Sequence, residues 1–160
     1  MSDDLPLGAF RFFVSLDAAD AYLPAAQAQL VPFVSAGAFE QCSGLSADLE
    51  VLTYPEGGCN GFVHQLPVRH SWGRLTLRRG LIRDRLLWKW YEAGLSNSLG
   101  ARRDGAILAL DELGRPVLSW TFRGGLAAKW KGPDFAAMNN AIAVESLEIA
   151  HQGLEEVLLA

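Results

Sequence analysis

Apolar and polar residues alternate with a period of two in several separate segments of the sequence, and this feature most restricts the possible fold. In LSADLEVLTY (45–54), the polar residues Ser46, Asp48 and Glu50 alternate with apolar residues at 47, 49 and 51. Successive side chains of a strand point to opposite faces of a sheet, so the pattern predicts a strand with one wet and one buried face. The same alternation predicts strands within GAFRFFVSL (8–16), WGRLTLRRG (72–80) and PVLSWTFR (116–123).

Turn-forming residues divide these segments. Ser43-Gly44 separates SAGAFEQCSG from the strand at 45–54, which predicts a hairpin or a paired bend there. Leu113-Gly114-Arg115 predicts a hairpin between strands at 106–111 and 116–123. The remaining predicted segments are an Ala- and Pro-punctuated irregular insertion (17–33), a long loop (55–71), a Gly/Pro/Asn-rich passage (132–140), a last strand within AIAVESLEIAHQG (141–153) and a short tail (154–160).

One segment departs from the period of two. In RGLIRDRLLWKWYEAG (79–94), Leu87, Trp88 and Tyr91 lie on one stripe at helical spacing, which Leu95 continues. Asp84 lies near the start, where a carboxylate favours the helix dipole, and Gly94 is a suitable C-terminal stop. The spacing predicts a helix of about three turns whose stripe covers the core.

Trp90 falls off this predicted stripe. Four basic residues surround it in the sequence: Arg79, Arg83, Arg85 and Lys89. Tryptophan and arginine are enriched in protein–protein contacts, although a cation–π pair on the surface fits equally well. We therefore expect Trp90 and the basic residues to face outward or toward a neighbouring subunit.

The order of these elements predicts a mainly β (α+β) fold. About six or seven mainly antiparallel strands and one helix fit an antiparallel β-sandwich or partly closed barrel with the helix packed on it. A chain of 160 residues is long enough for one core, so we expect a single domain over residues 1–160.

Composition restricts the class of function. The formal net charge is −4, whereas a dedicated nucleic-acid binder is usually basic, so specific nucleic-acid binding is not expected. The start MSDDLPLGAF carries acids where a signal peptide carries Lys or Arg, and no stretch is long and apolar enough for a membrane span. Cys42 and Cys59 fit free thiols, and we expect a soluble protein made in the cytoplasm.

No sequence motif indicates catalysis or a cofactor. The glycine pairs at 57–58 and 124–125 supply neither a P-loop nor a dinucleotide fingerprint, and GxSxG is absent. A zinc site from Cys59, His64 and His70 is a minor alternative, because their spacing matches no established metal motif. We therefore expect no enzyme activity, cofactor or metal.

Several motifs taken together resemble a known family, the tail-tube (inner tube) proteins of contractile phages and phage-derived contractile injection systems. The resemblance rests on FEQCSGLSADLEVLTYPEGG, on the LTLRRG…D..LW.WY block, on the LDE.G.P…W.F…..KW.GPD block and on the ending E.LE.AH.GLE. It implies a structural protein that forms six-fold rings stacked into a hollow tube inside a sheath. The implied partners are other copies of the chain, a sheath protein, baseplate or hub and tube-cap proteins, and a cargo in the lumen.

The resemblance also implies roles for individual residues. A tube needs a wet strand face toward its lumen, and Ser46, Asp48 and Glu50 supply one, although an outer-surface strand alternates in the same way. The long loop at 55–71 is the candidate for contact between rings. The candidate core-covering residues are Leu87, Trp88 and Tyr91, and the candidate subunit-interface residues are Trp90, Arg83 and His64.

Three alternatives remain at this point. A secreted type VI-like ring protein shares the expected architecture and differs in being exported. A second alternative is a monomeric β-barrel carrier for a small apolar ligand. Such a protein would have a closed pocket, and this function does not account for the alternating polar residues at 46–50. An enzyme requires a convergent set of titratable groups, which the sequence does not display.

Overall fold

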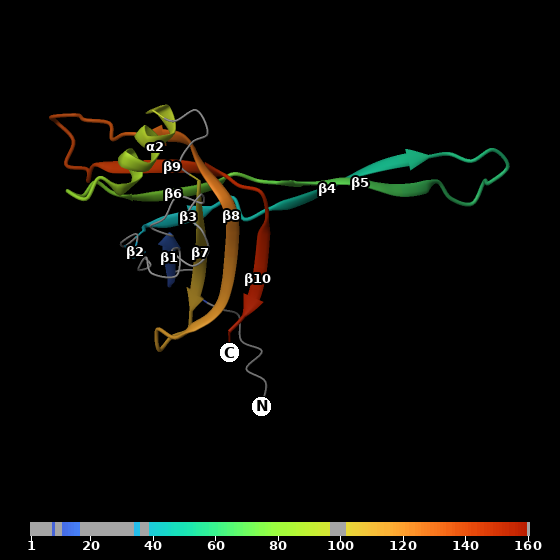
Figure 1. Cartoon of the computed structure of the whole chain (residues 1–160), viewed down its shortest axis with the longest axis horizontal. Helices are drawn as coiled ribbons and strands as arrows, with labels where there is room; N and C mark the ends of the chain where they lie inside the picture. The colour runs from blue at the N-terminus through green and yellow to red at the C-terminus, as the bar shows by residue number, and fades with distance from the viewer. Residues whose placement is uncertain (1–7, 9–10, 17–33, 36–38, 97–101, 160) are drawn as a thin grey trace.

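A computed structural model describes residues 8, 11–16, 34–35, 39–96 and 102–159 (Figure 1). Within them lie ten strands and the helix α2. The predicted insertion at 17–33 lies outside the described residues. The elements are β1 (Phe12–Leu16), β2 (Val34–Ser35), β3 (Gln41–Ser43), β4 (Ala47–Tyr54), β5 (His64–Trp72), β6 (Leu75–Gly80), α2 (Leu86–Ser96), β7 (Arg103–Leu110), β8 (Pro116–Lys131), β9 (Val144–Ala150) and β10 (Leu154–Leu158).

The strands form a large body sheet and a separate hairpin. The body sheet has the order β2-β1-β7-β8-β9-β6-β3, with β10 also paired to β8, and the hairpin consists of β4 and β5. Every pairing is antiparallel. The body sheet is not closed, so the predicted mainly β, antiparallel fold class with a packed helix is confirmed in its partly open form.

β8 joins the two halves of the body sheet. Its first part pairs with β7 and β10, and its second part pairs with β9. The sequence predicted that this strand ends at Arg123, but it continues through Gly124 and Gly125 to Lys131 and curves across the body (Figure 1). Gly124 has a φ of 60°, and a Cβ on Gly125 would lie 2.8 Å from the carbonyl oxygen of Arg103. The glycines therefore bend the strand instead of ending it.

The turn between β7 and β8 lies where the sequence predicts it. Asp111 Oδ1 accepts hydrogen bonds from the backbone N–H groups of Leu113 (2.9 Å) and Arg115 (2.8 Å). Gly114 has a φ of 78°, which favours glycine. The backbone N–H of Arg115 is the main reason why the pKa of Asp111 lies below its usual value.

The core lies between the strands and under α2. Alternate residues of β6 and β9 are buried, as the period of two requires. Leu87 of the helix packs into the same cluster. The buried apolar residues are Val14, Leu16, Leu75, Leu77, Leu87, Trp90, Ile107, Phe122, Leu147 and Ile149.

The position of Trp90 corrects the sequence prediction. Its side chain is 1% exposed and belongs to the core, whereas Leu95 on the predicted stripe is 67% exposed. The buried stripe therefore runs through Leu87, Trp90 and Tyr91, which are spaced i, i+3 and i+4. The guanidinium of Arg103 lies 5.7 Å from the centroid of the Trp90 ring, so this basic neighbour comes from β7.

Trp88 and Tyr91 lie at the edge of the helix–sheet contact. Both are half-buried, and the Trp88 ring meets the Trp130 ring edge-on at 4.7 Å between centroids. Tyr91 packs against the core cluster. The helix begins at Leu86 and runs to Ser96, two residues beyond the predicted stop at Gly94.

A buried ion cluster ties the helix entry to the sheet. Glu145 of β9 is fully buried, and its Oε1 lies 3.0 Å from Arg79 Nε of β6. Its Oε2 accepts a hydrogen bond from Trp130 Nε1 at 3.2 Å and lies 3.5 Å from Arg85 Nη1. Arg79 also donates to the backbone carbonyl of Asp84 at 3.0 Å. One carboxylate thus holds β6, β8, β9 and the segment that leads into α2.

Three strands were not predicted from the sequence: β5, β10 and the two-residue β2. The predicted loop at 55–71 contains most of β5, and the predicted tail contains β10. The turn at Ser43-Gly44 does not form a hairpin, because β3 pairs with β6 while β4 pairs with β5. The real hairpin is longer: the chain leaves the body along β3 and β4, turns, and returns along β5 and β6.

We expect Arg79→Met to lower the free energy of unfolding by about 3–5 kcal/mol, because Glu145 would remain buried with its closest positive charge removed. Urea denaturation followed by tryptophan fluorescence measures this. Arg123→Met is the matched control, since Arg123 pairs with Glu155 at 3.2 Å on the exposed surface, and we expect about 0–1 kcal/mol. Equal losses in both variants would contradict the importance of the buried pair.

Candidate functional site: the projecting hairpin

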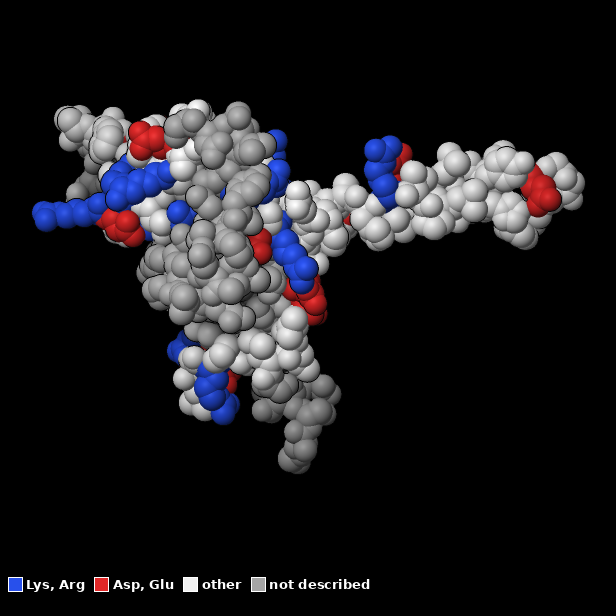
Figure 2. All heavy atoms as spheres, viewed as in Figure 1, with Lys and Arg blue, Asp and Glu red and all other residues white. Residues whose placement is uncertain are grey.

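The β4–β5 hairpin projects from the body as a long arm (Figure 1). All 8 residues of β4 are exposed, and so is every residue of β5 after His64. Figure 2 shows the arm as a mostly uncharged surface. Its exposed large apolar residues are Leu49, Val51, Leu52, Tyr54, Phe62, Val63, Leu66, Val68 and Trp72.

Both faces of the hairpin lie in water, which corrects the prediction of one buried face at 47, 49 and 51. Leu49 and Val51 are each 45% exposed. No element of the described chain packs extensively on either strand. An isolated two-stranded hairpin is marginally stable in water, and a contiguous exposed apolar surface marks an interaction site. The described residues do not supply a surface that covers the hairpin, which makes it the candidate site for contact with another molecule.

A register shift between Glu50 and Val51 lies close to the boundary between two parts of the hairpin, which we call the base (47–51 and 67–72) and the tip (52–66). At the base, Asp48 pairs with Ser71 and Glu50 pairs with Arg69 on one face, which we call the polar base face. Leu49 lies opposite His70 on the other face. Ala47 and Trp72 share that apolar base face, where the Trp72 ring stacks near His70.

The tip has the opposite polarity. Alternation along β4 puts Leu52 and Tyr54 on the same side as Asp48 and Glu50. Their partners are Leu66 and His64, so this side of the tip is apolar, and we call it the apolar tip face. The other side carries Thr53 opposite Gln65. The apolar side thus changes from one face to the other along the arm, which requires covering surfaces on opposite sides.

One ion pair and one histidine–carboxylate contact lie on the hairpin. Arg69 Nε donates to Glu50 Oε2 at 2.7 Å on the polar base face. His64 Nε2 lies 2.8 Å from Glu56 Oε2 in the tip, and the Phe62 ring meets the His64 ring edge-on at 5.0 Å. Both pairs are solvent-exposed and contribute little to stability in the isolated chain.

Two glycines fix the direction in which the hairpin leaves the body. Gly44 has a φ of 91°, and a Cβ there would lie 1.9 Å from the carbonyl oxygen of Arg74. A Cβ on Gly73 would lie 2.0 Å from Ser46 Oγ. The Gly73 N–H donates to the carbonyl of Ser46 at 3.1 Å, and His151 Nε2 lies 2.9 Å from the carbonyl oxygen of Gly73. The two strands therefore cross closely at the junction, and the body holds them.

The predicted site residues lie in three different places. Asp48 and Glu50 lie on the polar base face, with exposed Ser46 at its start. His64 lies in the tip, and Arg83 lies far from it, in the exposed segment before α2. The apolar tip face was not predicted from the sequence, although residues 64, 66, 68, 70 and 72 of β5 alternate with polar residues and Pro67. The proline hid this signal, because it argues against a central strand.

The described residues contain no group of three or more His, Cys, Asp or Glu side chains that could hold a metal ion. Cys59, His64 and His70, the candidate zinc ligands, do not form such a group. Burial raises the pKa of the Cys42 thiol to about 11, which makes it a poor nucleophile. The described helix is too short and insufficiently apolar to cross a membrane.

The open antiparallel body and the uncovered arm together define an assembly protein, whose surface is complete only when other molecules pack on it. The model of the T4-like virus tail tube protein gp19 family matches residues 8–155, and the chain belongs to this family. The predicted relationship to tail tube proteins is thereby confirmed. No curated protein matches the chain.

Solved structures support the same relationship. The chain is similar to a chain in the cryo-EM structure of the anti-feeding prophage baseplate, with 27% identity, a TM-score of 0.79, and 96% of each chain covered. A chain of the sheath–tube complex of the extracellular contractile injection system PVC shares the fold at 19% identity and a TM-score of 0.79, covering 98% of this chain and 95% of that one. A type six secretion system protein is less similar, with 8% identity and a TM-score of 0.53. The match covers 92% of this chain and 83% of that one.

We expect Gly44→Ala to destabilise the protein by more than about 2 kcal/mol, because the new Cβ meets backbone atoms at an unfavourable φ. Gly58→Ala is the control: Gly58 has a φ of 87° but no atom within 4 Å of its Cβ position, so about 1 kcal/mol or less is expected. Urea denaturation of both variants measures the difference. A Gly44→Ala variant as stable as Gly58→Ala would contradict the close crossing.

We expect a thiol reagent at pH 8 to modify Cys59 in the unassembled protein and to leave Cys42 unmodified. A pKa near 11 leaves only about one Cys42 thiol in a thousand as the reactive thiolate at that pH. Mass spectrometry of peptides locates the label, and Cys59→Ser removes it. The rate at Cys42 should rise as the pH approaches 11; rapid labelling of Cys42 at pH 8 would contradict its burial.

Proposed function

We propose that this tail tube protein forms the inner tube of a contractile injection system, as six-fold rings stacked into a hollow tube inside a sheath. The observation that carries the proposal is the hairpin, whose two faces are both uncovered in the single chain. Family membership and similarity to the anti-feeding prophage chain support it, since that structure is a six-fold symmetrised baseplate. We further propose that residues 1–160 act as one domain.

The change of apolar side along the arm favours a ring and a stack over a simple dimer. A two-fold dimer buries the same patch on both copies and leaves the opposite side of each arm in water. Heterologous contacts join two different surfaces of neighbouring copies. They form a closed ring when the rotation from one copy to the next adds up to a full turn, and an open filament when it does not. In our proposal the apolar base face packs on a neighbour in the same ring, and the tip reaches a further copy.

We propose that the polar base face lines the lumen. It carries Asp48, Ser71 and the Glu50–Arg69 pair. Because Arg69 neutralises Glu50, Asp48 supplies the net negative charge of this face in each copy. Rings of such carboxylates repel polyanions, so nucleic acids and other acidic cargo would pass without adhering.

The proposed role is mechanical and non-catalytic. We propose a sheath protein, baseplate or hub proteins and a tube cap as partners, because the similar chains come from sheath–tube, baseplate and cap complexes. No cofactor takes part, and the chain would be made in the cytoplasm and assembled into the particle there. The tube transmits the motion of the contracting sheath.

Negative-stain microscopy of the chain, alone and co-expressed with its baseplate and sheath neighbours, tests this proposal. We expect hollow tubes or six-fold rings in at least one preparation. A chain that stays monomeric and joins no tube in both preparations would refute the proposal and favour the small-ligand carrier. Free rings exported into the medium without a sheath would favour the type VI-like alternative.

We expect Leu49→Lys to abolish tube formation and Asp48→Lys to leave it intact. The two positions are adjacent but face opposite sides of the base, so a lysine is buried in an interface at 49 and faces the lumen at 48. Microscopy counts the tubes, and circular dichroism confirms that both variants fold. Equal loss of tubes in both variants would contradict the assignment of the two base faces.

A further inference from the structure

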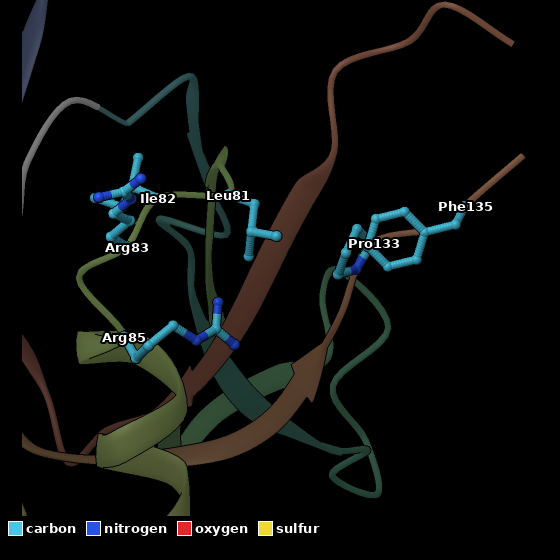
Figure 3. A pocket seen from close by; sticks show the side chains of 6 residues that line it. All are labelled: Leu81, Ile82, Arg83, Arg85, Pro133 and Phe135. Carbon is cyan, nitrogen blue, oxygen red and sulfur yellow. The ribbon is translucent and has the colours of Figure 1, made fainter. Parts of the chain in front are cut away.

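An open apolar pocket lies between the segment before α2 and the segment after β8 (Figure 3). It has a volume of about 510 Å³. Leu81 lies on one side, and Pro133 and Phe135 lie on the other. Phe135 is 80% exposed, so the described chain leaves its ring largely uncovered. The lining residues are Leu81, Ile82, Arg83, Arg85, Pro133 and Phe135.

The pocket carries positive charge at its rim. Both of its charged lining residues are arginines. Arg85 forms an ion pair with Glu145, with Nη1 3.5 Å from Oε2, whereas Arg83 is exposed. Asp84 lies next in the sequence but does not line the pocket. The site therefore combines an uncovered aromatic ring with at least one exposed cation.

The hairpin tip has the complementary properties. Leu52, Tyr54 and Leu66 form its apolar face, and each is at least 44% exposed. Among residues 51–66, Glu56 is the one acidic or basic residue apart from His64. The tip is thus mainly apolar and carries one carboxylate, that of Glu56, which also lies 2.8 Å from His64 Nε2. Figure 2 shows an acidic group near the end of the arm, and a basic and an acidic group nearer its base.

The turn of the hairpin lies at one end of the molecule, and the segments before α2 and after β8, which carry the pocket residues, lie at the other end (Figure 1). β6 separates them: its Leu75 end adjoins the base of the hairpin, and its Gly80 end continues into Leu81 of the pocket. At about 3.3 Å per residue, this strand alone spans roughly 20 Å. A tip cannot reach the pocket of its own chain, so a contact between them joins two copies head to tail.

We propose that the hairpin tip of one copy docks in the Leu81–Phe135 pocket of a second copy, with Glu56 beside Arg83. This inference rests on the proposed tube function and names the two surfaces of one of its contacts. Docking covers the apolar tip face and the Phe135 ring at once, and it pairs the carboxylate of the tip with the exposed guanidinium at the rim. Because the two surfaces differ, each copy offers one tip and one pocket, and the contact propagates from copy to copy.

The native Cys59 of the tip makes the contact testable by cross-linking. We expect a Phe135→Cys variant, assembled into tubes and treated with a short bismaleimide, to give a ladder of covalent oligomers in denaturing gels. Peptide mass spectrometry should show Cys59 of one copy joined to residue 135 of another. The partly buried Cys42, whose pKa is raised to about 11, should take no part.

Two variants control this experiment. Phe135→Cys combined with Cys59→Ser should give no ladder. Leu113→Cys places an equally accessible thiol, 76% exposed, in the turn between β7 and β8, and it should give at least ~tenfold less cross-linking. Tubes without a Cys59–residue 135 cross-link would overturn the docking while leaving the proposed function intact. A cross-link from residue 135 to the sheath protein would also overturn it and assign the pocket to that partner.

A charge exchange tests the Glu56–Arg83 pairing. Arg83→Glu, in the Phe135→Cys background, should reduce the cross-linked fraction ~tenfold, because two carboxylates would meet at the rim. Adding Glu56→Arg should restore it. Failure of the second change to restore cross-linking would refute the pairing, and failure of every variant, including the parent chain, to form tubes would instead count against the proposed function.

Discussion

Glu145 is the residue on which the arrangement of the body depends. A fully buried carboxylate requires opposite charge and hydrogen-bond donors, and here Arg79, Arg85 and Trp130 supply them. These partners come from β6, from the segment before α2 and from β8. Together with β9, which carries Glu145, four parts of the chain are therefore held by contacts to one carboxylate. The same segment carries Leu81 and Arg83 to the pocket rim, and β6 leads in the other direction to the hairpin. One buried charge therefore sets the distance between the two surfaces that we propose to meet.

The hairpin differs from the body because none of the described elements packs extensively on it. In the body, alternation produces one buried face per strand; in the hairpin, both faces remain in water, and the apolar side changes at the register shift after Glu50. The crossing at Gly44 and Gly73 holds the arm in one direction. An arm whose direction is set at its base loses less conformational entropy on binding than an arm free to swing, so more of its apolar surface contributes to assembly. This combination suits a tube that must transmit force.

The sequence predicted the elements whose signal is local. The alternation at Leu75 and Leu77, the turn around Gly114 and the helix at 86–96 all follow from spacing and turn chemistry. Trp90 was misplaced because stripes through Leu95 or through Trp90 both fit helical spacing, and only the position of the sheet distinguishes them. β5 was missed because Pro67 and the histidines obscure its alternation. The arginines near the helix suggested a surface role, yet Arg79 is 1% exposed, since its partner Glu145 is distant in the sequence.

The sequence by itself determined the antiparallel, mainly β class and, through its motifs, membership of the tail tube family, because both depend on residue order along the chain. Only the tertiary structure decided which apolar residues the chain buries and which it leaves for a neighbour. Leu49 and Leu77 both follow the same period of two, but the first projects into water and the second lies in the core. Alternation specifies that a strand has an apolar face; what packs on that face depends on where the strand leaves the body.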